Sequence, residues 1–355
     1  MGATSTAAMD EDVPQRQAGR ETGEASAAAP RRLGVLHHPA VRIMLLIALG
    51  VAAFFVVIAV LRVDVAAVVA SVRRIRVGHF ALVCLFAYGV VAGNAARWRT
   101  LAGGQVQIAY WRTFAAFALG FFVNLLLPLR GGDLGRVVLV ARISGRSVPR
   151  LLALELLDRT VDFASMAALA AALFALSPLP PTLKMGIVSI LVASLVVVAL
   201  LFWVGRFRLQ PGQSRWRRRL GQFAEGARAI RGVSPLIAAF LIGLFPWIWE
   251  TGMLLLMGHA CGAPLSPAAA LAVLLAINLS FIVPVPGQVG AYEGLGVATL
   301  LFFGVDRATA VAFMFLFHLA HIVPNSLLGL GLLLGGFGRR PAAVTEGPAP
   351  SESDG

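Results

Sequence analysis

The stretch that decides the fold reads TFAAFALGFFVNLLLPLRGGDLGR and covers residues 113–136. Its first fifteen residues are nearly all apolar, whereas a helix that crosses a bilayer needs about 20. Pro128 then removes a backbone donor, and the glycines after it make continuation of a helix costly. We therefore expect a short apolar helix over residues 113–127 that ends beside charged side chains at membrane depth.

A second stretch has the same pattern. Residues 268–282 are again fifteen largely apolar residues, and PVPGQVGAYE follows at residues 284–293. Short hydrophobic segments broken by Pro and Gly, in corresponding places of two halves, point to the binding site of a transporter. Asn124 and Asn278 precede the breaks, and we expect them to bond backbone groups that are freed there. The residues expected to form the breaks, with glycines that let the backbone approach a ligand, are Pro128, Gly132, Gly135, Pro286, Gly287 and Gly290.

The composition is that of a polytopic membrane protein. The 355 residues are 58% hydrophobic and 13% charged, a balance that soluble domains do not have. The net charge of +13 comes almost entirely from arginine, because Lys184 is the only lysine. A nucleic-acid partner is the ordinary alternative for a basic chain, but these arginines flank apolar segments, which favours membrane orientation and anionic headgroups. With only Cys84 and Cys261, we expect neither a disulfide framework nor a metal site.

The arginines also predict the orientation of the chain. The loop at residues 205–234 carries eight of them and should be cytoplasmic, and Arg97 and Arg99 mark the cytoplasmic end of an earlier segment. This orientation makes both broken segments re-entrant, the first from the cytoplasm and the second from outside. The predicted fold class is all-α, a polytopic membrane protein with about seven crossing helices plus two oppositely oriented re-entrant helical hairpins that form an inverted repeat. The expected crossing segments include residues 43–61, 79–96, 151–176, 185–204, 235–257 and 308–336.

Three parts follow one another along the chain. We expect a disordered N-terminal tail at residues 1–41, an integral membrane domain at 42–340 that includes the basic loop 205–234, and a disordered C-terminal tail at 341–355. The segment 43–61 fits a retained signal anchor better than a cleaved signal. Both termini should be cytoplasmic, in the inner membrane of a bacterium.

Two basic segments have apolar residues at helical spacing. Val65, Val68, Val69 and Val72 lie in a loop that we place outside although it carries four arginines, so we expect an amphipathic helix on the bilayer. In the cytoplasmic loop, a second stripe predicts a basic interfacial helix, and a charged loop that only sets the topology stays an alternative. This stripe consists of Trp216, Leu220, Phe223, Ala227 and Ile230.

Four ionisable residues lie on one face of the segment 151–176. They are Glu155, Asp158, Arg159 and Asp162, spaced as i, i+3, i+4 and i+7. Each would cost a few kcal/mol if it faced lipid, so they must face a cavity or pair with partners. Arg130 and Arg136 are the nearest candidates in the sequence. Two interpretations stay open, a polar lining for a charged headgroup or an ion-pair cluster that only locks helices together.

Two carboxylates and two histidines lie in other apolar segments. Glu250 and Glu293 are lone carboxylates, and either could be a proton carrier or a hydrogen-bonded packing group. We interpret His318 and His321 as packing or water-bonded side chains.

The sequence carries none of the common enzyme motifs. It has no phosphate-binding P-loop, no Gly-x-Ser-x-Gly elbow and no His-Glu-x-x-His metal helix. A membrane phosphotransferase is the enzymatic alternative. Such an enzyme would need a nucleophile or a metal-binding aspartate cluster, and the sequence offers neither outside the charged stripe. We therefore expect no enzymatic activity, no cofactor and no ATPase in this chain.

Three motifs resemble the flippase-like, lysylphosphatidylglycerol-synthase transmembrane-region family of bacterial and archaeal membrane proteins. They are LPLRGGDLGR at residues 127–136, Asp158-Arg159-x-x-Asp162, and Pro286-Gly287-x-x-Gly290-x-Tyr292-Glu293. The resemblance covers roughly residues 42–340 and implies re-entrant helices around a central cavity, with lipid headgroups moved between leaflets. Asp158 stands where the family often has glutamate, and His318 where we expect arginine. About twenty residues follow the last helix, too few for the aminoacyl-transferase domain of two-part members, so lipid aminoacylation should be absent.

The sequence thus predicts a lipid transporter or flippase-like protein that moves a phospholipid or glycolipid headgroup between leaflets. Its arginines would neutralise phosphate, because guanidinium stays charged and forks onto phosphate oxygens, and its carboxylates would hold those arginines or meet a cationic headgroup. The alternative is a non-transporting membrane scaffold or regulator of envelope-lipid synthesis. The expected partners are membrane lipids and a separate lipid-synthesis enzyme, with no nucleic acid. The expected substrate-binding residues are Arg130, Asp133, Arg136, Glu155, Asp158, Arg159, Asp162, Tyr292 and Glu293.

Overall fold

The computed structural model describes residues 65–73, 75, 77–127, 131–174, 181–206, 214–228, 232–280, 288 and 290–337. The chain divides into two units, Met1–Arg42 and Ile43–Gly355, and all described residues belong to the second. Over these residues the regular structure is helical, without a strand, which confirms the all-α class. The two expected tails and the expected crossing segment 43–61 lie outside the described residues.

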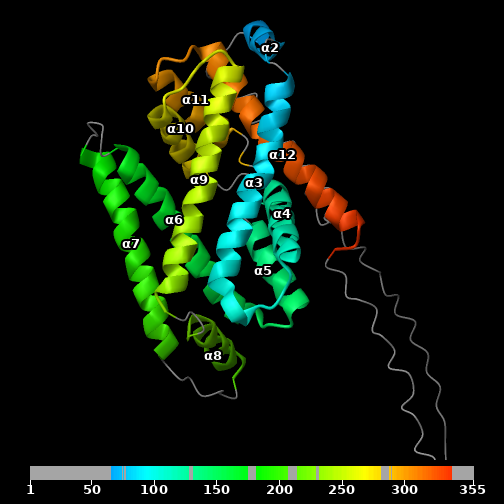
Figure 1. Ribbon diagram of the computed structural model, residues 1–355, viewed down its shortest axis with the longest axis vertical. Helices are drawn as coiled ribbons and strands as arrows, with labels where there is room; N and C mark the ends of the chain where they lie inside the picture. Colours follow the sequence, from blue (N-terminus) through cyan, green and yellow to red (C-terminus); the bar gives the residue numbers. More distant parts are fainter. Residues whose placement is uncertain are drawn as a thin grey trace, which may run out of the picture. The chain divides into compact units, whose positions relative to one another are not determined.

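Three helices in the described part are long and apolar enough to cross a membrane. They are α3 (Val77–Ala102), α9 (Ser234–Ala260) and α12 (Arg307–Leu334). Helices α3 and α9 pack side by side along the middle of the molecule, and α12 packs against α3 (Figure 1). Each corresponds to an expected crossing segment, so these three segments are confirmed as helices of membrane length.

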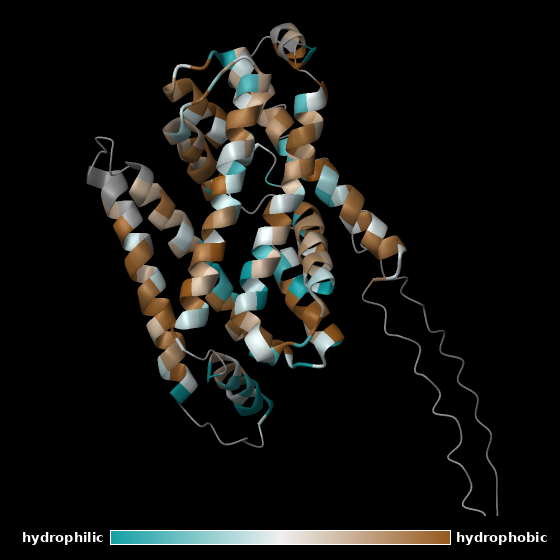
Figure 2. Cartoon of the chain, in the orientation of Figure 1, coloured by the Kyte–Doolittle hydropathy of each residue, from teal (hydrophilic) through white to brown (hydrophobic). Residues whose placement is uncertain are grey.

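Two further helices have similar length. They are α7 (Pro181–Arg206), whose sequence is apolar over most of its length, and α6 (Val148–Phe174), which carries the charged stripe. The outer face of α7 is apolar, with Leu195 and Trp203 more than half exposed, as expected for contact with lipid (Figure 2). The total number of crossings stays a prediction.

Two pairs of short helices replace the two broken segments. The first pair is α4 (Tyr110–Leu126) with α5 (Gly131–Ser144), and the second is α10 (Pro267–Leu279) with α11 (Ala291–Phe302). The members of each pair pack against one another. Helix α4 ends one residue before the predicted position 127, and α10 ends three residues before the predicted position 282. Residues 128–130, 281–287 and 289 lie outside the described part. Figure 1 shows the first pair in the half of the molecule that contains α8 and the second pair in the half that contains α2.

Each short pair is built into its own hydrophobic core. One core contains α10 and α11 with parts of α9 and α12, and the other contains α4 and α5 with parts of α6 and α7. Helix α3 contributes to both, since Val83 lies in the first core and Leu101 in the second. The long helices therefore connect two cores, each organised around one short pair.

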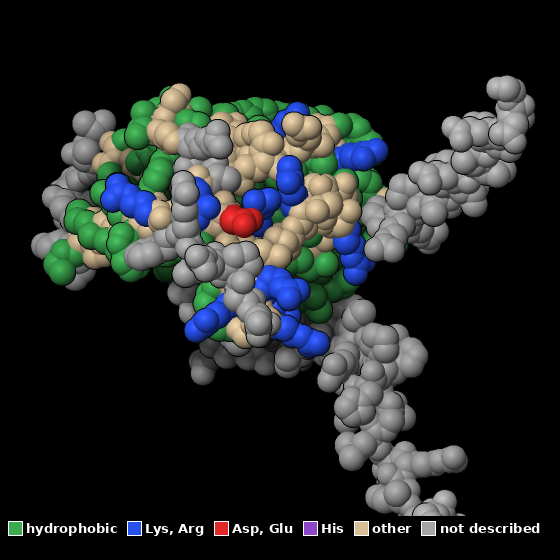
Figure 3. Space-filling model, turned by 90° about the horizontal axis from the view of Figure 1, so that it is seen from below, with side chains coloured by type: hydrophobic (Ala, Val, Ile, Leu, Met, Phe, Trp, Pro, Cys, Tyr) green, Lys and Arg blue, Asp and Glu red, His purple; other side chains and the backbone are tan. Residues whose placement is uncertain are grey.

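The two predicted amphipathic segments are both helical. In α2 (Val65–Arg73), Val68 and Val72 pack on the protein core, so this face meets the protein, and its expected contact with the bilayer stays a prediction. In α8 (Arg215–Arg228), Ala224 and Ala227 are buried against the protein, whereas Trp216 is 67% exposed. Ile230, the last residue of the predicted stripe, lies outside the described part. Figure 3 shows arginine side chains gathered on the face of the molecule that carries α8.

Helix α8 is fixed to the ends of its neighbours. A Cβ on Gly226 would lie 2.3 Å from the carbonyl oxygen of Arg150, so only glycine allows this approach to α6. Arg150 forms an ion pair with Glu225 at 2.9 Å, and Arg228 donates to the carbonyl of Gly205 at the end of α7. The basic segment is therefore a docked helix rather than a charged loop that only sets topology.

Candidate functional site

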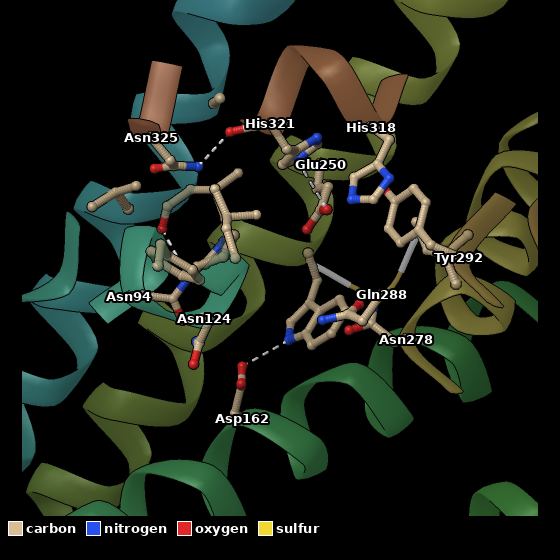
Figure 4. Close-up of a pocket in the computed structure, with 18 of the residues that line it drawn as sticks. Asn94, Asn124, Asp162, Glu250, Asn278, Gln288, Tyr292, His318, His321 and Asn325 are labelled. Atoms are coloured by element: carbon tan, nitrogen blue, oxygen red, sulfur yellow. Dashed lines mark hydrogen bonds and ion pairs between the residues drawn. The ribbon is translucent and has the colours of Figure 1, made fainter. Parts of the chain in front are cut away.

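A cavity of about 150 Å³ lies where the two halves of the molecule meet. Its lining residues come from the middle of the long helices, such as Val91 of α3, Trp247 of α9 and His321 of α12. Trp247 is the central residue of α9, thirteen residues from either end. The polar and aromatic lining residues are Asn94, Phe121, Asn124, Arg159, Asp162, Phe163, Trp247, Glu250, Asn278, Gln288, Tyr292, His318, His321 and Asn325. Figure 4 labels ten of the polar ones.

Both short pairs reach this cavity at the ends of their first helices. Asn124 is in the last turn of α4 and Asn278 in the last turn of α10, and both line the cavity. Asn124 Oδ1 accepts a hydrogen bond of 2.8 Å from the N–H of Gly132, which confirms that it bonds a backbone group freed at the first break. Asn278 donates to the carbonyl of Leu274, one turn back in its own helix.

The charged stripe of α6 forms a buried network of ion pairs. Arg159 lies 3.2 Å from Glu155, 3.3 Å from Asp162 and 3.7 Å from Asp133 of α5. Glu155 also pairs with Arg136, the partner that the sequence suggested. The stripe thus faces the protein and joins α6 to α5, as required for charges at this depth.

Arg97 of α3 is the network residue that the sequence analysis missed. We expected it to flank its segment, but α3 continues past it to Ala102 and its side chain is completely buried, whereas the side of the membrane stays a prediction. Its guanidinium pairs with Asp158 at 2.9 Å and with Asp162 at 2.5 Å. Asp162 also accepts a hydrogen bond of 3.1 Å from the indole of Trp247, so one carboxylate connects α3, α6 and α9. Asp158 is fully buried and faces Arg97 rather than the cavity.

The other residues expected near the first break take different positions. Arg136 is buried, pairs with Glu155 and stacks 3.5 Å from the ring centroid of Phe117, so it does not line the cavity. Asp133 accepts a hydrogen bond from Asn124. Gly132 faces α4, and a Cβ there would lie 2.0 Å from the carbonyl oxygen of Gly120. We expected Gly132 and Gly135 to approach a ligand, but Gly132 makes helix contact and Gly135 is exposed with open space around it. Pro128, Arg130, Pro286 and Gly287 lie outside the described residues.

On the opposite wall, the second break presents Tyr292 and the residues bonded to it. The ring of Tyr292 stacks on His318 with centroids 4.2 Å apart. Glu293, the next residue after Tyr292, accepts a hydrogen bond of 2.6 Å from the N–H of Gly290. Gly290 has a φ of +91°, a conformation that favours glycine at this helix cap. The other oxygen of Glu293 lies 2.6 Å from His318 Nδ1.

We expected the histidines of α12 to be packing or water-bonded side chains, but each has a carboxylate partner. His318 pairs with Glu293, and His321 Nε2 lies 3.3 Å from Glu250 of α9. The two carboxylates that looked isolated in the sequence therefore have histidine partners. Sequence separations of 25 and 71 residues hide both pairs from local pattern analysis.

These features define an integral membrane protein, all helical where described, with a polar cavity at mid-length of its membrane-length helices. The sequence matches the family described as Lysylphosphatidylglycerol synthase TM region over residues 45–329. The chain therefore belongs to this family, which agrees with the resemblance of its motifs. No curated protein matches the chain. The family connects the protein with lipid-related processes of the cell envelope.

Proposed function

We propose that the protein moves a phospholipid or glycolipid headgroup between membrane leaflets through the central cavity, without an ATPase or another enzymatic activity of its own. In this proposal the membrane is the inner membrane of a bacterium, with the face that carries α8 in the cytoplasm. The partners are membrane lipids and, upstream, a separate enzyme that makes the lipid.

One observation carries this proposal, the position of the cavity. Charged side chains at the middle of membrane-length helices are costly and usually mark a pathway for a substrate or an ion. Here Arg159, Asp162 and Glu250 line the cavity at that level. The amide oxygen of Asn325, which also lines the cavity, is buried and without a hydrogen-bond partner among the described residues. Such a group requires water or a polar ligand.

The short helix pairs would serve as re-entrant hairpins, one from each side of the membrane. Their position in opposite halves of the molecule, and the arrival of Asn124 and Asn278 at one cavity, support this arrangement. Arg159 would meet the lipid phosphate, because 18% of its side chain is exposed, whereas Arg97 and Arg136 are almost fully enclosed by their partners.

The ion-pair network leaves a second candidate function. Most of its arginine–carboxylate contacts are satisfied without a ligand, which is also what a membrane scaffold would need to lock α3, α5 and α6 together. The two functions differ in the role of Arg159. A scaffold would need the ion pairs of Arg159, whereas a transporter would need the part of its side chain that is exposed to the cavity.

Reconstitution separates the two functions. Full-length protein in phosphatidylethanolamine and phosphatidylglycerol vesicles should move fluorescent phospholipid between leaflets, as measured by dithionite quenching. Arg159→Gln should slow this movement by about ten-fold, the effect of one charge-assisted contact. Arg142→Gln, the same change at an exposed site on α5, should not slow it. If lipid moves no faster with wild-type protein than in empty vesicles, the scaffold is favoured. A chemically altered lipid, detected by mass spectrometry, would instead show an enzyme.

Cysteine labelling tests the hairpins. In a variant without Cys84 and Cys261, single cysteines would flank each short pair, at Gln107 and Arg142 for the first and at Pro264 and Phe302 for the second. An impermeant reagent should label both sites of one pair from the same side, and the two pairs from opposite sides. If the two sites of either pair are labelled from different sides, that pair crosses the membrane and the hairpin is wrong.

A further inference from the structure

Two histidine–carboxylate pairs lie on the cavity wall formed by α9, α11 and α12. Glu293 meets His318, and Glu250 meets His321. Figure 4 labels both members of the second pair. The pairs look alike, but their hydrogen bonds require different numbers of protons.

The Glu293–His318 pair is complete without an additional proton. A neutral His318 with hydrogen on Nδ1 donates across 2.6 Å to one oxygen of Glu293. The other oxygen accepts from the N–H of Gly290. Both oxygens of the carboxylate therefore face donors, and the pair joins α11 to α12.

The Glu250–His321 pair cannot be completed in this way. His321 Nδ1 lies 3.0 Å from the carbonyl oxygen of Phe317, which can only accept, so Nδ1 carries a hydrogen. In a neutral ring, Nε2 would then present a lone pair to Glu250 Oε1, 3.3 Å away. Two acceptors at this distance repel one another, so the contact needs a further proton on one of the two atoms. The atoms are within ion-pair distance but lack the alignment of a full hydrogen bond, which makes the contact easy to open.

The pair borders the cavity, although the Nε2 atom of His321 is itself buried. The side chains of Glu250 and His321 are 16% and 20% exposed and both line the cavity. The titratable and charged groups around them are Arg159 and Asp162 on α6, Tyr292 and Glu293 on α11, His318 on α12 and Tyr88 on α3.

The pair also connects two helices next to a proline inside each of them. Pro246 lies one turn before Glu250 in α9, and Pro324 lies three residues after His321 in α12. A proline inside a helix removes a backbone hydrogen bond and allows the helix to bend there. A contact that forms or breaks next to both prolines can therefore change how α9 and α12 lie against one another.

We propose that Glu250 and His321 form a proton-binding site, and that its occupancy couples headgroup movement to a proton. The proton joins α9 to α12, and its loss lets the two facing acceptors separate. The coupling rests on the proposed transport function, whereas the proton site itself does not.

The first experiment counts protons on purified full-length protein. In a potentiometric titration between about pH 5 and about pH 10, the wild type should bind one proton more than the double variant Glu250→Gln/His321→Gln. Glu225→Gln should match the wild type, because Glu225 is exposed on α8 and titrates below this range. Equal proton counts for the wild type and the double variant would overturn the site. Thermal unfolding shows whether each variant is folded, and Glu250→Asp, which keeps a titratable group, should keep the proton.

The second experiment tests the coupling in the same phosphatidylethanolamine and phosphatidylglycerol vesicles. An imposed pH gradient should change the leaflet distribution of labelled phospholipid by at least about five-fold, the lower end of typical coupling. Glu250→Gln should abolish this response and Glu225→Gln should keep it. Wild-type protein that moves lipid without responding to the gradient would refute the coupling and leave the transport function intact. If the wild type moves no lipid, the transport function and its coupling both fail, and the proton count alone decides the site.

Discussion

Replacing Gly132 by alanine tests whether this glycine is required for the contact between α5 and α4. A Cβ at this position would lie 2.0 Å from the carbonyl oxygen of Gly120 and 2.7 Å from the backbone nitrogen of Asn124. These are backbone atoms, so neither can rotate away as a flexible side chain would. The substitution must therefore push α5 away from α4 and weaken the hydrogen bond between Gly132 N–H and Asn124 Oδ1.

The expected cost follows from these contacts. Overpacking a close contact costs about 1–3 kcal/mol, and the lost hydrogen bond adds about 1 kcal/mol. Alanine regains about 1 kcal/mol of helix propensity over glycine. Gly132→Ala should therefore lower the free energy of unfolding by about 1–3 kcal/mol.

Gly135 is the matched control in the same helix. A Cβ there meets nothing within 4 Å, so Gly135→Ala should stabilise the protein by about 0.5–1 kcal/mol. Unfolding in detergent micelles with a rising fraction of sodium dodecyl sulfate measures both variants. If Gly132→Ala is as stable as the wild type, or if the two variants are equally destabilised, the close approach of α4 and α5 is not what requires glycine.

Three further predictions follow from other contacts. Arg97→Met should destabilise the protein by about 3–5 kcal/mol in the same unfolding assay, because it leaves buried carboxylates unpaired, whereas Arg99→Met, at an exposed neighbour, should cost much less. Gly329→Ala should lower stability because a Cβ would lie 2.4 Å from Cβ of Phe122, and Gly331→Ala, with open space around it, should not. The hydrogen bonds to Thr309 hold the pKa of Asp306 below its usual range. The carboxylate therefore stabilises α12 at pH values above the pKa of a free aspartate, and this stabilisation is lost as the pH falls through the lowered pKa. Thermal unfolding should show Asp306→Ala less stable than the wild type near pH 7 and nearly equal to it near pH 2.

Local spacing was sufficient to predict one side of the ion-pair network. The i, i+3, i+4, i+7 pattern on α6 placed four ionisable residues on one face, and the cost of exposing charge to lipid required that face to meet protein or a cavity. Arg136 was found because it lies near in sequence and next to a visible break. The family membership and the helical class were likewise accessible, because both depend on composition and short motifs.

Contacts between distant helices could not be predicted in this way. Arg97 lies 61 residues from Asp158, and in the sequence it looks like the flanking charge of a membrane helix. Gly132 and Gly135 are equivalent in the motif, yet only the first meets another backbone. Three residues leave the second glycine offset by about 60° around the helix, which is enough to move it out of the contact with α4. The protonation of His321 depends on a carbonyl in its own helix and a carboxylate on α9, and no spacing rule contains both.

The central position of the cavity determines the length of any path through the protein. Trp247 has thirteen residues of α9 on either side, which corresponds to about 20 Å of helix in each direction. In the proposed transport, a headgroup held at this level would therefore have two halves of path of equal length, one towards each end of α9. Because Pro246 lines the cavity, a bend of α9 at this proline would act on both halves of the path in one movement.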